Sequence, residues 1–420
     1  MNRQYWFYID TYVHISIKKD AVLFYNSYTG KILEYSGKPD IQRLTGRLLS
    51  TKNLRVIRLR ENTLNNTIIK TFVGEIRDHF MGDLIDASLS EGKPIQMTPI
   101  VKVQRDVKYL GGETGRSVGE DMMEYLSDVS LYLNNRCGQS CSICSSAFHQ
   151  FPCCTANKAG EHELDIKYVR RLINEIKKCS LLNLNILGGD IFMYPKLEEL
   201  LELLNSTLFS KNYFIHYLNV TTHKDLLNVL NRVNTFVKIP ISFPVDEKKL
   251  KTAIEAATSL RIEVIFNFII RSEKDFEDAN ILISKFHINK YEFYAYYDGA
   301  NFDFFRDNIF IDKEEIENTR PSLKDIYAMG TVNPLNFGHI TILADGAIYA
   351  NVNKSRLGLL GRHSIYDIVF KEMKNGKSWR LLRKNVIPCK GCTFKNLCPP
   401  ISNYNIALGK NNLCHIRQGK

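Results

Sequence analysis

Three cysteines lie within one short segment, CGQSCSIC. They are Cys137, Cys141 and Cys144, with the spacing C-x3-C-x2-C. Three thiolates on one loop can hold three irons of a [4Fe-4S] cube, for which a fourth cysteine is the usual complement. A cube with three protein ligands keeps one iron open, and an open metal position binds a substrate or a cofactor. Zinc is an alternative, because His149 would complete a four-ligand site.

A second group of cysteines lies near the carboxyl terminus, with the spacing C-x2-C-x5-C-x15-C. Its members are Cys389, Cys392, Cys398 and Cys414. Four thiolates suit an iron–sulfur cluster or a structural zinc ion, and both interpretations stay open. Two further cysteines, Cys153 and Cys154, follow the first group closely. They are either a thiol pair near a substrate or inert buried residues.

We expect these cysteines to lie in a reducing compartment. The amino terminus lacks the apolar core of a signal peptide, and no apolar run approaches the roughly 18 residues of a membrane span. We therefore predict a cytoplasmic protein without membrane contact, in which clustered cysteines hold metal or do redox chemistry. The net charge of +11 favours an acidic partner, either a nucleic acid or an acidic peptide. Part of that excess is local to residues 371–395, beside the second cysteine group.

Apolar, strand-like runs alternate with helical patterns from Asp128 onward. The predicted strands are 128–135, 181–189, 213–221, 236–243, 261–270 and 289–297. Six strand–helix repeats predict parallel strands joined by crossover helices, in a full or partial TIM-like barrel or in a doubly wound sheet. In either fold, chemistry belongs at the carboxyl ends of the strands. The first cysteine group lies there, directly after the first strand.

The two ends of the chain do not show this regular alternation of strand and helix patterns. Residues 1–127 predict several antiparallel strands, with helices around 40–49 and 64–80, so we expect a small α+β module, winged-helix-like in character. Beyond a polar linker after residue 300, a hairpin is predicted across the Asp345–Gly346 turn. The second cysteine group follows that hairpin.

The motifs resemble those of the radical S-adenosylmethionine (SAM) enzymes. CGQSCSIC resembles the cluster loop of that family, and LGGD, residues 187–190, resembles its Gly-Gly-Glu motif. The cysteine-rich tail resembles a SPASM domain, the auxiliary-cluster extension of peptide-modifying members. The resemblance implies an α/β fold with three units: an amino-terminal module at 1–125, a partial (β/α)6 barrel at 126–300, and a linker with a SPASM-like domain at 301–420.

The resemblance also implies a reaction and residues to carry it. The open iron would bind SAM, and reductive cleavage would give a 5′-deoxyadenosyl radical that takes a hydrogen from the substrate. The residues expected to bind SAM are Ile143, Gly188, Gly189, Asp190, Ser242 and Asn267. At the end of the sixth strand, Asp298 is the candidate catalytic residue, beside Tyr294, Tyr296 and Tyr297. Aromatic packing is the alternative role for these tyrosines.

The tail matches only part of a complete SPASM domain. The thiols of one auxiliary [4Fe-4S] cluster are all present, whereas Ser402 and Ala350–Asn351 stand where ligands of another would be. We therefore predict two clusters in all: the one with an open iron, and one auxiliary cluster.

SPASM extensions imply peptide or protein substrates, here a ribosomally made precursor peptide whose leader the amino-terminal module binds by strand addition. The resemblance also implies an electron donor such as flavodoxin or ferredoxin. KDAVLFYNSYTGKILEY and FHQFPCC are similar to a Bacteroidetes group encoded beside peptides with Gly-Gly leaders. Two alternatives remain: a catalytically silent peptide-binding partner with structural clusters, and a tRNA-modifying radical SAM enzyme. No RNA-binding module is recognised, so we do not expect a nucleic-acid partner.

Overall fold

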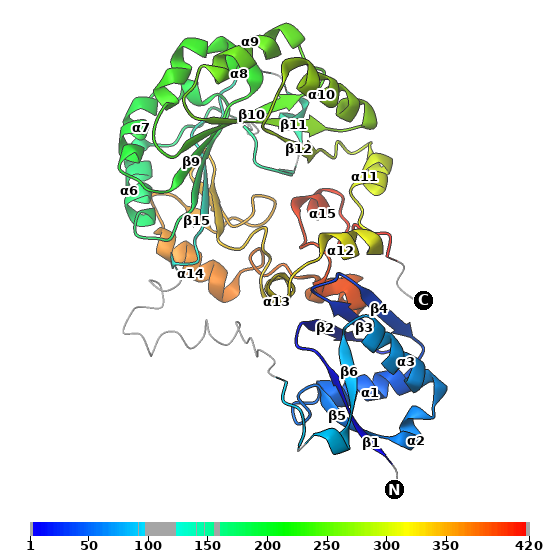
Figure 1. Cartoon of the computed structure of the whole chain (residues 1–420). Helices are drawn as coiled ribbons and strands as arrows, with labels where there is room; N and C mark the ends of the chain where they lie inside the picture. Colours follow the sequence, from blue (N-terminus) through cyan, green and yellow to red (C-terminus); the bar gives the residue numbers. More distant parts are fainter. Residues whose placement is uncertain are drawn as a thin grey trace.

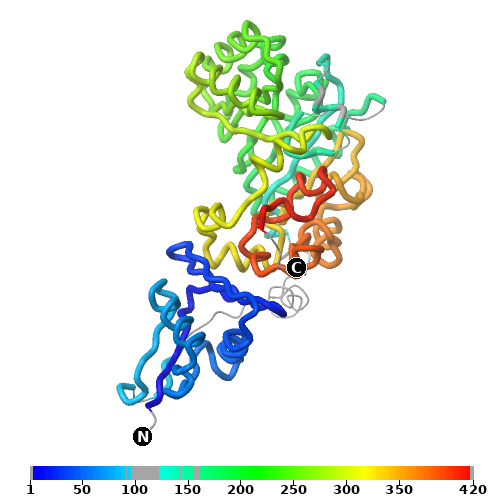
Figure 2. Tube along the Cα trace, turned by 90° about the vertical axis from the view of Figure 1, so that its right-hand side faces the viewer, coloured from blue at the N-terminus to red at the C-terminus, as the bar shows by residue number. Residues whose placement is uncertain are grey.

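A computed structural model describes residues 3–90, 92–96, 123–139, 141–146, 148–154 and 160–416. The chain forms an elongated molecule, with an amino-terminal module at one end and a curved sheet with its helices at the other (Figures 1 and 2). The cysteine-rich tail lies between these two parts.

The amino-terminal module contains two three-stranded antiparallel sheets, with strand orders β5-β1-β6 and β2-β3-β4. The strands are β1 (Gln4–Ile9), β2 (Val13–Ile17), β3 (Ala21–Asn26), β4 (Ile32–Ser36), β5 (Val56–Arg60) and β6 (Gly82–Asp86). The helices are α1 (Pro39–Leu49), α2 (Glu61–Leu64) and α3 (Thr67–Asp78). Helix α3 begins where the Asn66 side chain caps its first turn, and its buried face places Phe72 in the module's core. The helices predicted around 40–49 and 64–80 are therefore present.

The central part is a run of parallel strands in sequential order, β7 to β12. The strands are β7 (Asp128–Tyr132), β8 (Asn183–Leu187), β9 (Ser210–Phe214), β10 (Thr235–Ser242), β11 (Glu263–Ile270) and β12 (Tyr291–Ala295). The connecting helices are α6 (Ile166–Ile176), α7 (Leu197–Asn205), α8 (Tyr217–Thr222), α9 (Glu247–Thr258) and α10 (Glu273–Phe286). Among the described residues, no helix has the length and apolar character needed to span a bilayer.

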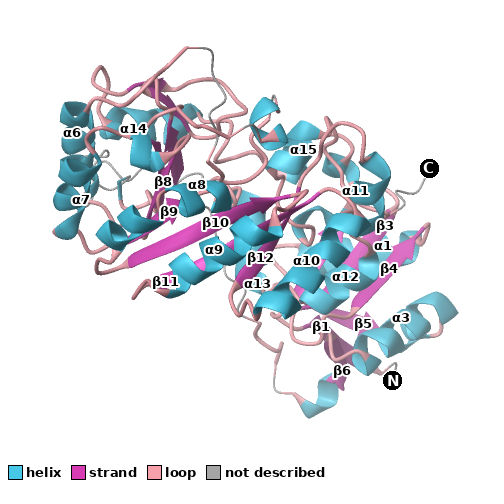
Figure 3. Ribbon diagram, turned by 90° about the horizontal axis from the view of Figure 1, so that it is seen from above, coloured by secondary structure: helices cyan, strands magenta, loops and turns pink. Residues whose placement is uncertain are grey.

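The two faces of this sheet decide between a partial barrel and a doubly wound fold. The helices lie on its convex outer face (Figures 1 and 3). On the concave side, Asn212 donates to Asn185 at 2.9 Å, and Asn185 donates to Ser130 at 3.2 Å. A doubly wound sheet would carry helices on both faces and a reversal in strand order. The sequential order and the polar concave face identify a partial (β/α) barrel.

One predicted strand is misplaced. The sequence predicts a strand over 213–221, but β9 ends at Phe214 and helix α8 begins at Tyr217. The apolar run continues through the strand end because both elements bury side chains, among them Tyr213 and Val220. Burial alone does not separate a strand from a short buried helix that follows it.

The hairpin predicted at Asp345–Gly346 is present, and it extends the barrel sheet. Strand β13 (His339–Ile342) pairs antiparallel with β14 (Ala347–Tyr349) and parallel with β7, and β14 pairs with β15 (Gly358–Leu359). The helices after residue 300 are α11 (Phe302–Asn308), α12 (Lys313–Thr319), α13 (Leu323–Thr331), α14 (Ile365–Asn375) and α15 (Asn403–Ala407). The sheet therefore crosses the domain boundary that the sequence suggests at residue 300.

The amino-terminal module packs against the cysteine-rich tail. Leu23, Tyr25 and Ile32 of the module share a hydrophobic core with the tail residues Phe394 and Cys398. Polar contacts follow the same interface: the Thr393 hydroxyl donates to Glu34 at 3.0 Å, and the Lys18 ammonium donates to the Lys390 carbonyl at 2.9 Å. The second cysteine group is thereby tied to the module at the far end of the molecule.

This interface should make stability depend on pH. Burial, helped by the nearby charges of Arg55 and Lys395, lowers the pKa of His14 to about 4. The unfolded chain then gains this proton near pH 6.5 and the folded chain only near pH 4, so stability is full above 6.5 and falls below it. We expect His14→Phe to remove about 2 kcal/mol of the difference in unfolding free energy between pH 7 and pH 5. Urea denaturation at both pH values measures this, and equal pH dependence in the two proteins would contradict it.

Candidate metal and cofactor site

The first cysteine group lies at the carboxyl end of β7, as the sequence predicts. The chain leaves the strand at Tyr132 and makes a short 3-10 turn over Ser142–Ser145, in which the Cys144 amide donates to the Cys141 carbonyl at 3.0 Å. The three thiols are partly buried. The loop therefore holds its sulfurs at the edge of the sheet where parallel strands place chemistry.

A buried asparagine joins this loop to the turn after β8. The Asn134 side chain is fully buried; its amide donates to the Asp190 carbonyl at 2.9 Å, and its oxygen accepts the Arg136 amide at 2.9 Å. The Asp190 amide in turn donates to the Arg136 carbonyl at 2.6 Å. These bonds fix the Gly188–Gly189–Asp190 turn directly against the residue that precedes Cys137.

The two glycines of the LGGD segment are required by close approach as well as by backbone conformation. Their φ angles are +106° at Gly188 and +50° at Gly189. A Cβ at Gly189 would lie 2.1 Å from the Arg136 carbonyl oxygen, and one at Gly188 would lie 2.5 Å from the Asn134 carbonyl oxygen. Only glycine lets the turn approach the cysteine loop so closely.

Gly189→Ala should therefore displace the cysteine loop. We expect a loss of about 2 kcal/mol or more in unfolding free energy, from strain and collision with the loop backbone, and a marked fall in metal content. Gly138 is the matched control, because it lies in the same loop and a Cβ added there would meet no atom within 4 Å. Metal analysis and denaturation of Gly189→Ala and Gly138→Ala test this, and equal behaviour of the two variants would contradict it.

Asp190 is buried, but its carboxylate already has partners. One oxygen accepts the Phe192 amide at 3.1 Å, and the other lies 2.8 Å from Nε2 of His223. A carboxylate with two oxygens has room for further donors. Asp190 therefore lies at the predicted place beside the cysteine loop, and His223 orients it.

The residues predicted at β10 and β11 face the same region. Ser242 ends β10, and its hydroxyl oxygen lies 3.2 Å from Nε2 of His216, which is 3.6 Å from the sulfur of Cys141. Asn267 is 2% exposed, and both polar atoms of its amide lack a hydrogen-bond partner. A buried amide without partners is costly unless a ligand satisfies it. Asn267 thus has the character of a ligand-binding residue.

An apolar cluster closes the other side of the loop. Ile143 is 7% exposed and packs with Cys153, Cys154, Ile269 and Tyr296. The Cys144 thiol donates to the Cys154 carbonyl at 3.6 Å. Ile143 therefore packs against the barrel wall, and Cys153 and Cys154 are buried next to the cysteine loop.

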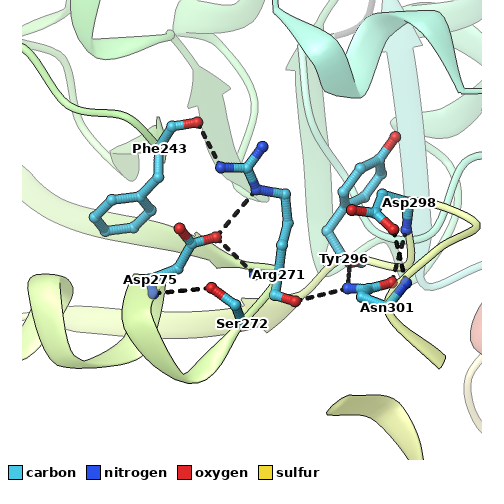
Figure 4. Close-up of polar contacts among 7 residues, drawn as sticks. All are labelled: Phe243, Arg271, Ser272, Asp275, Tyr296, Asp298 and Asn301. Atoms are coloured by element: carbon cyan, nitrogen blue, oxygen red, sulfur yellow. Dashed lines mark hydrogen bonds and ion pairs between the residues drawn. The ribbon is translucent and has the colours of Figure 1, made fainter. Parts of the chain in front are cut away.

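Asp298 does not join this group. The residue is exposed, and its carboxylate accepts the amides of Ala300 and Asn301 at 2.8 and 3.0 Å, as Figure 4 shows for Asn301. Asn301 then donates to the Tyr296 carbonyl at 2.9 Å. Asp298 shapes the turn after β12, and of the tyrosines beside it Tyr296 is the one that reaches the apolar cluster at the cysteine loop.

A second group of polar contacts lies at the carboxyl ends of β10 and β11. The Arg271 guanidinium donates to the Asp275 carboxylate at 3.0 Å and to the Phe243 carbonyl at 2.9 Å (Figure 4). These three residues help to line a cavity of about 410 Å³ beyond the strand ends. The group braces the edge of the barrel next to Ser242.

The surroundings of two loop thiols favour their protonated form. A hydrogen bond with Cys144, then burial, raises the pKa of Cys141, and burial raises the pKa of Cys137. Cys141 thus shares a hydrogen bond with the neighbouring Cys144. Within the described ranges, however, no three Cys, His, Asp or Glu side chains converge as the ligands of one metal ion do. A metal would have to displace the thiol protons as it binds.

The residues of this loop nevertheless fit a metal cluster and a cofactor. Three thiols with no acidic ligand among them match the donor set of an iron–sulfur centre. The glycine turn lies directly against the cysteine loop, and both polar atoms of the buried Asn267 amide lack a hydrogen-bond partner in the protein. His149, the predicted fourth zinc ligand, instead exchanges two backbone hydrogen bonds with Asn353 and packs its ring against Tyr132.

Two of the four tail cysteines, Cys392 and Cys398, pack in one apolar cluster, although no three Cys, His, Asp or Glu side chains of the described tail converge as the ligands of one metal ion do. Burial raises the pKa of Cys398 to about 12, against the opposing charge of Arg383. The Arg383 guanidinium is 8% exposed and donates to the Cys389 sulfur at 3.5 Å. A buried cation beside a thiol suits a site that becomes anionic when thiolates bind metal.

An amide network occupies the region of the missing ligands. The Asn351 side chain is 6% exposed and donates to Asn336 at 3.0 Å and to Asn403 at 2.7 Å. Ser402 caps helix α15 through its contacts with Asn405. Side-chain amides hold together the segments that a further cluster would join.

Three residues of the site were missed by the sequence analysis. His216 and Asn219 contact Cys141 and Cys137 respectively at 3.6 Å, and His223 contacts Asp190. His216 and Asn219 fall inside the wrongly predicted strand at 213–221. His223 lies just beyond that segment, between helix α8 and a 3-10 helix over Lys224–Leu230. Polar residues buried in an apolar run were the available signal.

Comparison with known proteins identifies the fold. No family model matches the sequence, and no curated protein matches it. Among solved structures, SuiB of Streptococcus suis bound to S-adenosylmethionine aligns with a TM-score of 0.50 at 10% identity, over 96% of this chain and 97% of SuiB. The chain shares the fold of SuiB. SuiB bound to its precursor peptide SuiA aligns with a TM-score of 0.49 at 11% identity, over 98% of this chain and 99% of SuiB.

The fold shared with SuiB agrees with the broader resemblance that the sequence suggests, at the level of architecture alone. The alignment with SuiB includes the amino-terminal module and the tail as well as the barrel, because it covers nearly all of both chains. The narrower similarity to a Bacteroidetes group with Gly-Gly leaders stays a prediction.

Proposed function

We propose that the protein is a radical SAM enzyme that modifies a peptide, with Cys137, Cys141 and Cys144 holding a [4Fe-4S] cluster. The observation that carries the proposal is the joining of these cysteines to the Gly188–Gly189–Asp190 turn through Asn134, at the carboxyl ends of β7 and β8. When bound, the cluster and SAM supply a one-electron reduction that yields a carbon radical.

The chain's own residues would bind and orient SAM. Asp190, held by His223, is placed for an ammonium group, and the glycine turn lets the backbone come close. Ser242 and the unpartnered Asn267 offer a hydroxyl and an amide from the next strands. Ile143 and Tyr296 form an apolar wall that keeps water from the reacting carbon.

The tail would carry one auxiliary [4Fe-4S] cluster, on Cys389, Cys392, Cys398 and Cys414. Sheet β2–β4 of the amino-terminal module packs against the tail, and among the described residues the edge strands of that module pair on one side only. Such edges can bind a peptide by strand addition, which supports a peptide substrate. SuiB, whose fold the chain shares, has been solved with S-adenosylmethionine and with a precursor peptide. A leader bound at a sheet edge would tether the rest of its peptide to the enzyme.

The test is anaerobic reconstitution with iron and sulfide, followed by reduction in the presence of SAM. We expect about eight irons per chain and slow formation of 5′-deoxyadenosine, since two cubes hold four irons each. An iron-loaded protein that binds SAM and never cleaves it would overturn the proposal and favour a silent peptide-binding partner. Binding of tRNA with a steep salt dependence would instead favour a nucleic-acid substrate.

A further inference from the structure

His216 lies between the cysteine loop and the end of β10. It precedes helix α8, is 3% exposed, and places Nε2 3.6 Å from the Cys141 sulfur and 3.2 Å from the Ser242 hydroxyl oxygen. A buried imidazole with one ring nitrogen facing a thiol is either a donor or an acceptor there. The partner of its other nitrogen decides which.

The other ring nitrogen fixes the tautomer. Nδ1 of His216 accepts the backbone amide of Leu218 at 3.4 Å, so it carries no proton. The single ring proton therefore sits on Nε2 and points to Cys141 and Ser242.

A second buried side chain makes an equivalent contact three residues further on. Asn219 is 2% exposed, and its Nδ2 donates to the Cys137 sulfur at 3.6 Å. Gln139 donates to the Asn219 oxygen at 3.1 Å, so the amide is held with its nitrogen toward the sulfur. Two of the three loop cysteines thus receive an N–H group from the segment after β9.

We propose that His216 and Asn219 are positioning residues that donate N–H···S hydrogen bonds to the loop cysteines and raise the reduction potential of the cluster there. This inference rests on the proposed function, because it needs a cluster on Cys137 and Cys141. Reduction adds negative charge to the cluster and its sulfurs, so an N–H dipole stabilises the reduced form more than the oxidised form.

Changing Ser242 should shift the reduction potential of the cluster in the direction opposite to a change of His216. The one proton on Nε2 is shared between the Cys141 sulfur and the Ser242 oxygen. Removing the hydroxyl sends that proton wholly to the sulfur and should make the cluster easier to reduce. Removing the imidazole should make it harder to reduce. A merely structural role would not give shifts of opposite sign on the two sides of one hydrogen-bond network.

The experiment is a redox titration of reconstituted full-length protein, followed by electron paramagnetic resonance. The loop cluster is identified as the signal that changes when SAM is added, and potentials are then read without SAM. At a fixed potential we expect the ratio of reduced to oxidised cluster to fall about tenfold in His216→Phe, a shift of about 59 mV for one electron. Asn219→Leu should shift it in the same direction, and Ser242→Ala in the opposite one.

Two controls separate the outcomes. His216→Gln keeps an N–H donor, so its reduction potential should lie closer to that of the unmodified protein than the potential of His216→Phe does. His339 pairs with Asp128 and lies outside this network, so His339→Phe should leave the reduction potential unchanged. Iron-loaded variants with the potential of the unmodified protein would overturn the inference while leaving the proposed function intact. Absence of iron at the loop in the unmodified protein would overturn the proposed function itself.

Discussion

Cys141→Ala should lower the iron content of the reconstituted protein from about eight to about four per chain and abolish formation of 5′-deoxyadenosine. Cys141 has the middle place in the loop and contacts both Cys144 and His216, so the loop cannot hold three irons without it. Iron analysis and product detection after anaerobic reduction measure the two effects. Loss of activity should reach the detection limit, because the missing ligand removes the open iron.

Cys179 provides the matched control for this change. It is half-buried outside both cysteine groups, and its thiol donates to the Glu175 carbonyl at 3.5 Å. Cys179→Ala should keep about eight irons and full SAM cleavage. If Cys141→Ala cleaved SAM as fast as Cys179→Ala, the loop would have no part in the chemistry.

Cys398→Ala should remove the auxiliary cluster and loosen the join between tail and amino-terminal module. Cys398 is 6% exposed and packs with Phe394, Leu397 and Ile32 in the core that the two parts share. Loss of a structural metal removes several kcal/mol of folding free energy, so we expect the midpoint of thermal unfolding to fall by about 5 °C or more. Calorimetry and iron analysis check the two results.

The cluster on the first cysteine loop is an internal control in the Cys398→Ala variant. The variant should keep about four irons, and the spectrum of those irons should still respond to SAM, because the first loop lies on the barrel. Zinc in place of iron at the tail of the unmodified protein would contradict the auxiliary cluster. Unchanged iron content and unfolding temperature in Cys398→Ala would contradict its structural role.

The parts of the site that the sequence predicts are those encoded by local patterns. The cysteine spacing and the LGGD turn each lie within a few residues, and each follows an apolar strand whose end is marked by glycine or polar residues. Because parallel strands carry their loops at one edge, the two patterns could be placed together before any contact was known. The positive φ angles of Gly188 and Gly189 show why that turn needs glycine.

The contacts that the sequence does not predict join residues far apart in the chain. His223 pairs with Asp190, which is 33 positions away in the sequence. The side chain of Asn353 accepts a hydrogen bond from the backbone amide of His149, which is 204 positions away. The pairing of β13 with β7 likewise joins segments that no local pattern relates. Such pairings join complementary groups that meet only in the folded chain. The periodicity and spacing of residues within one segment therefore do not predict them.

The strand predicted over 213–221 shows how one boundary error hides functional residues. In a strand at this place, His216 and Asn219 would belong to the barrel wall, one on each face, because side chains alternate along a strand. In the structure they follow β9 and lie three residues apart at the start of a short helix, which brings both to the cysteine loop. The apolar run in this segment gave no sign of the change from strand to helix.

The central claim is that the first cysteine loop holds a cluster with one iron open to SAM. The most direct measurement is electron paramagnetic resonance of the reduced, iron-loaded protein with and without SAM, alongside metal analysis of the same sample. The account predicts about eight irons per chain, no zinc at the loop, and a cluster signal that shifts when SAM is added. Zinc at the loop, or a reduced cluster whose signal is the same with and without SAM, would contradict it.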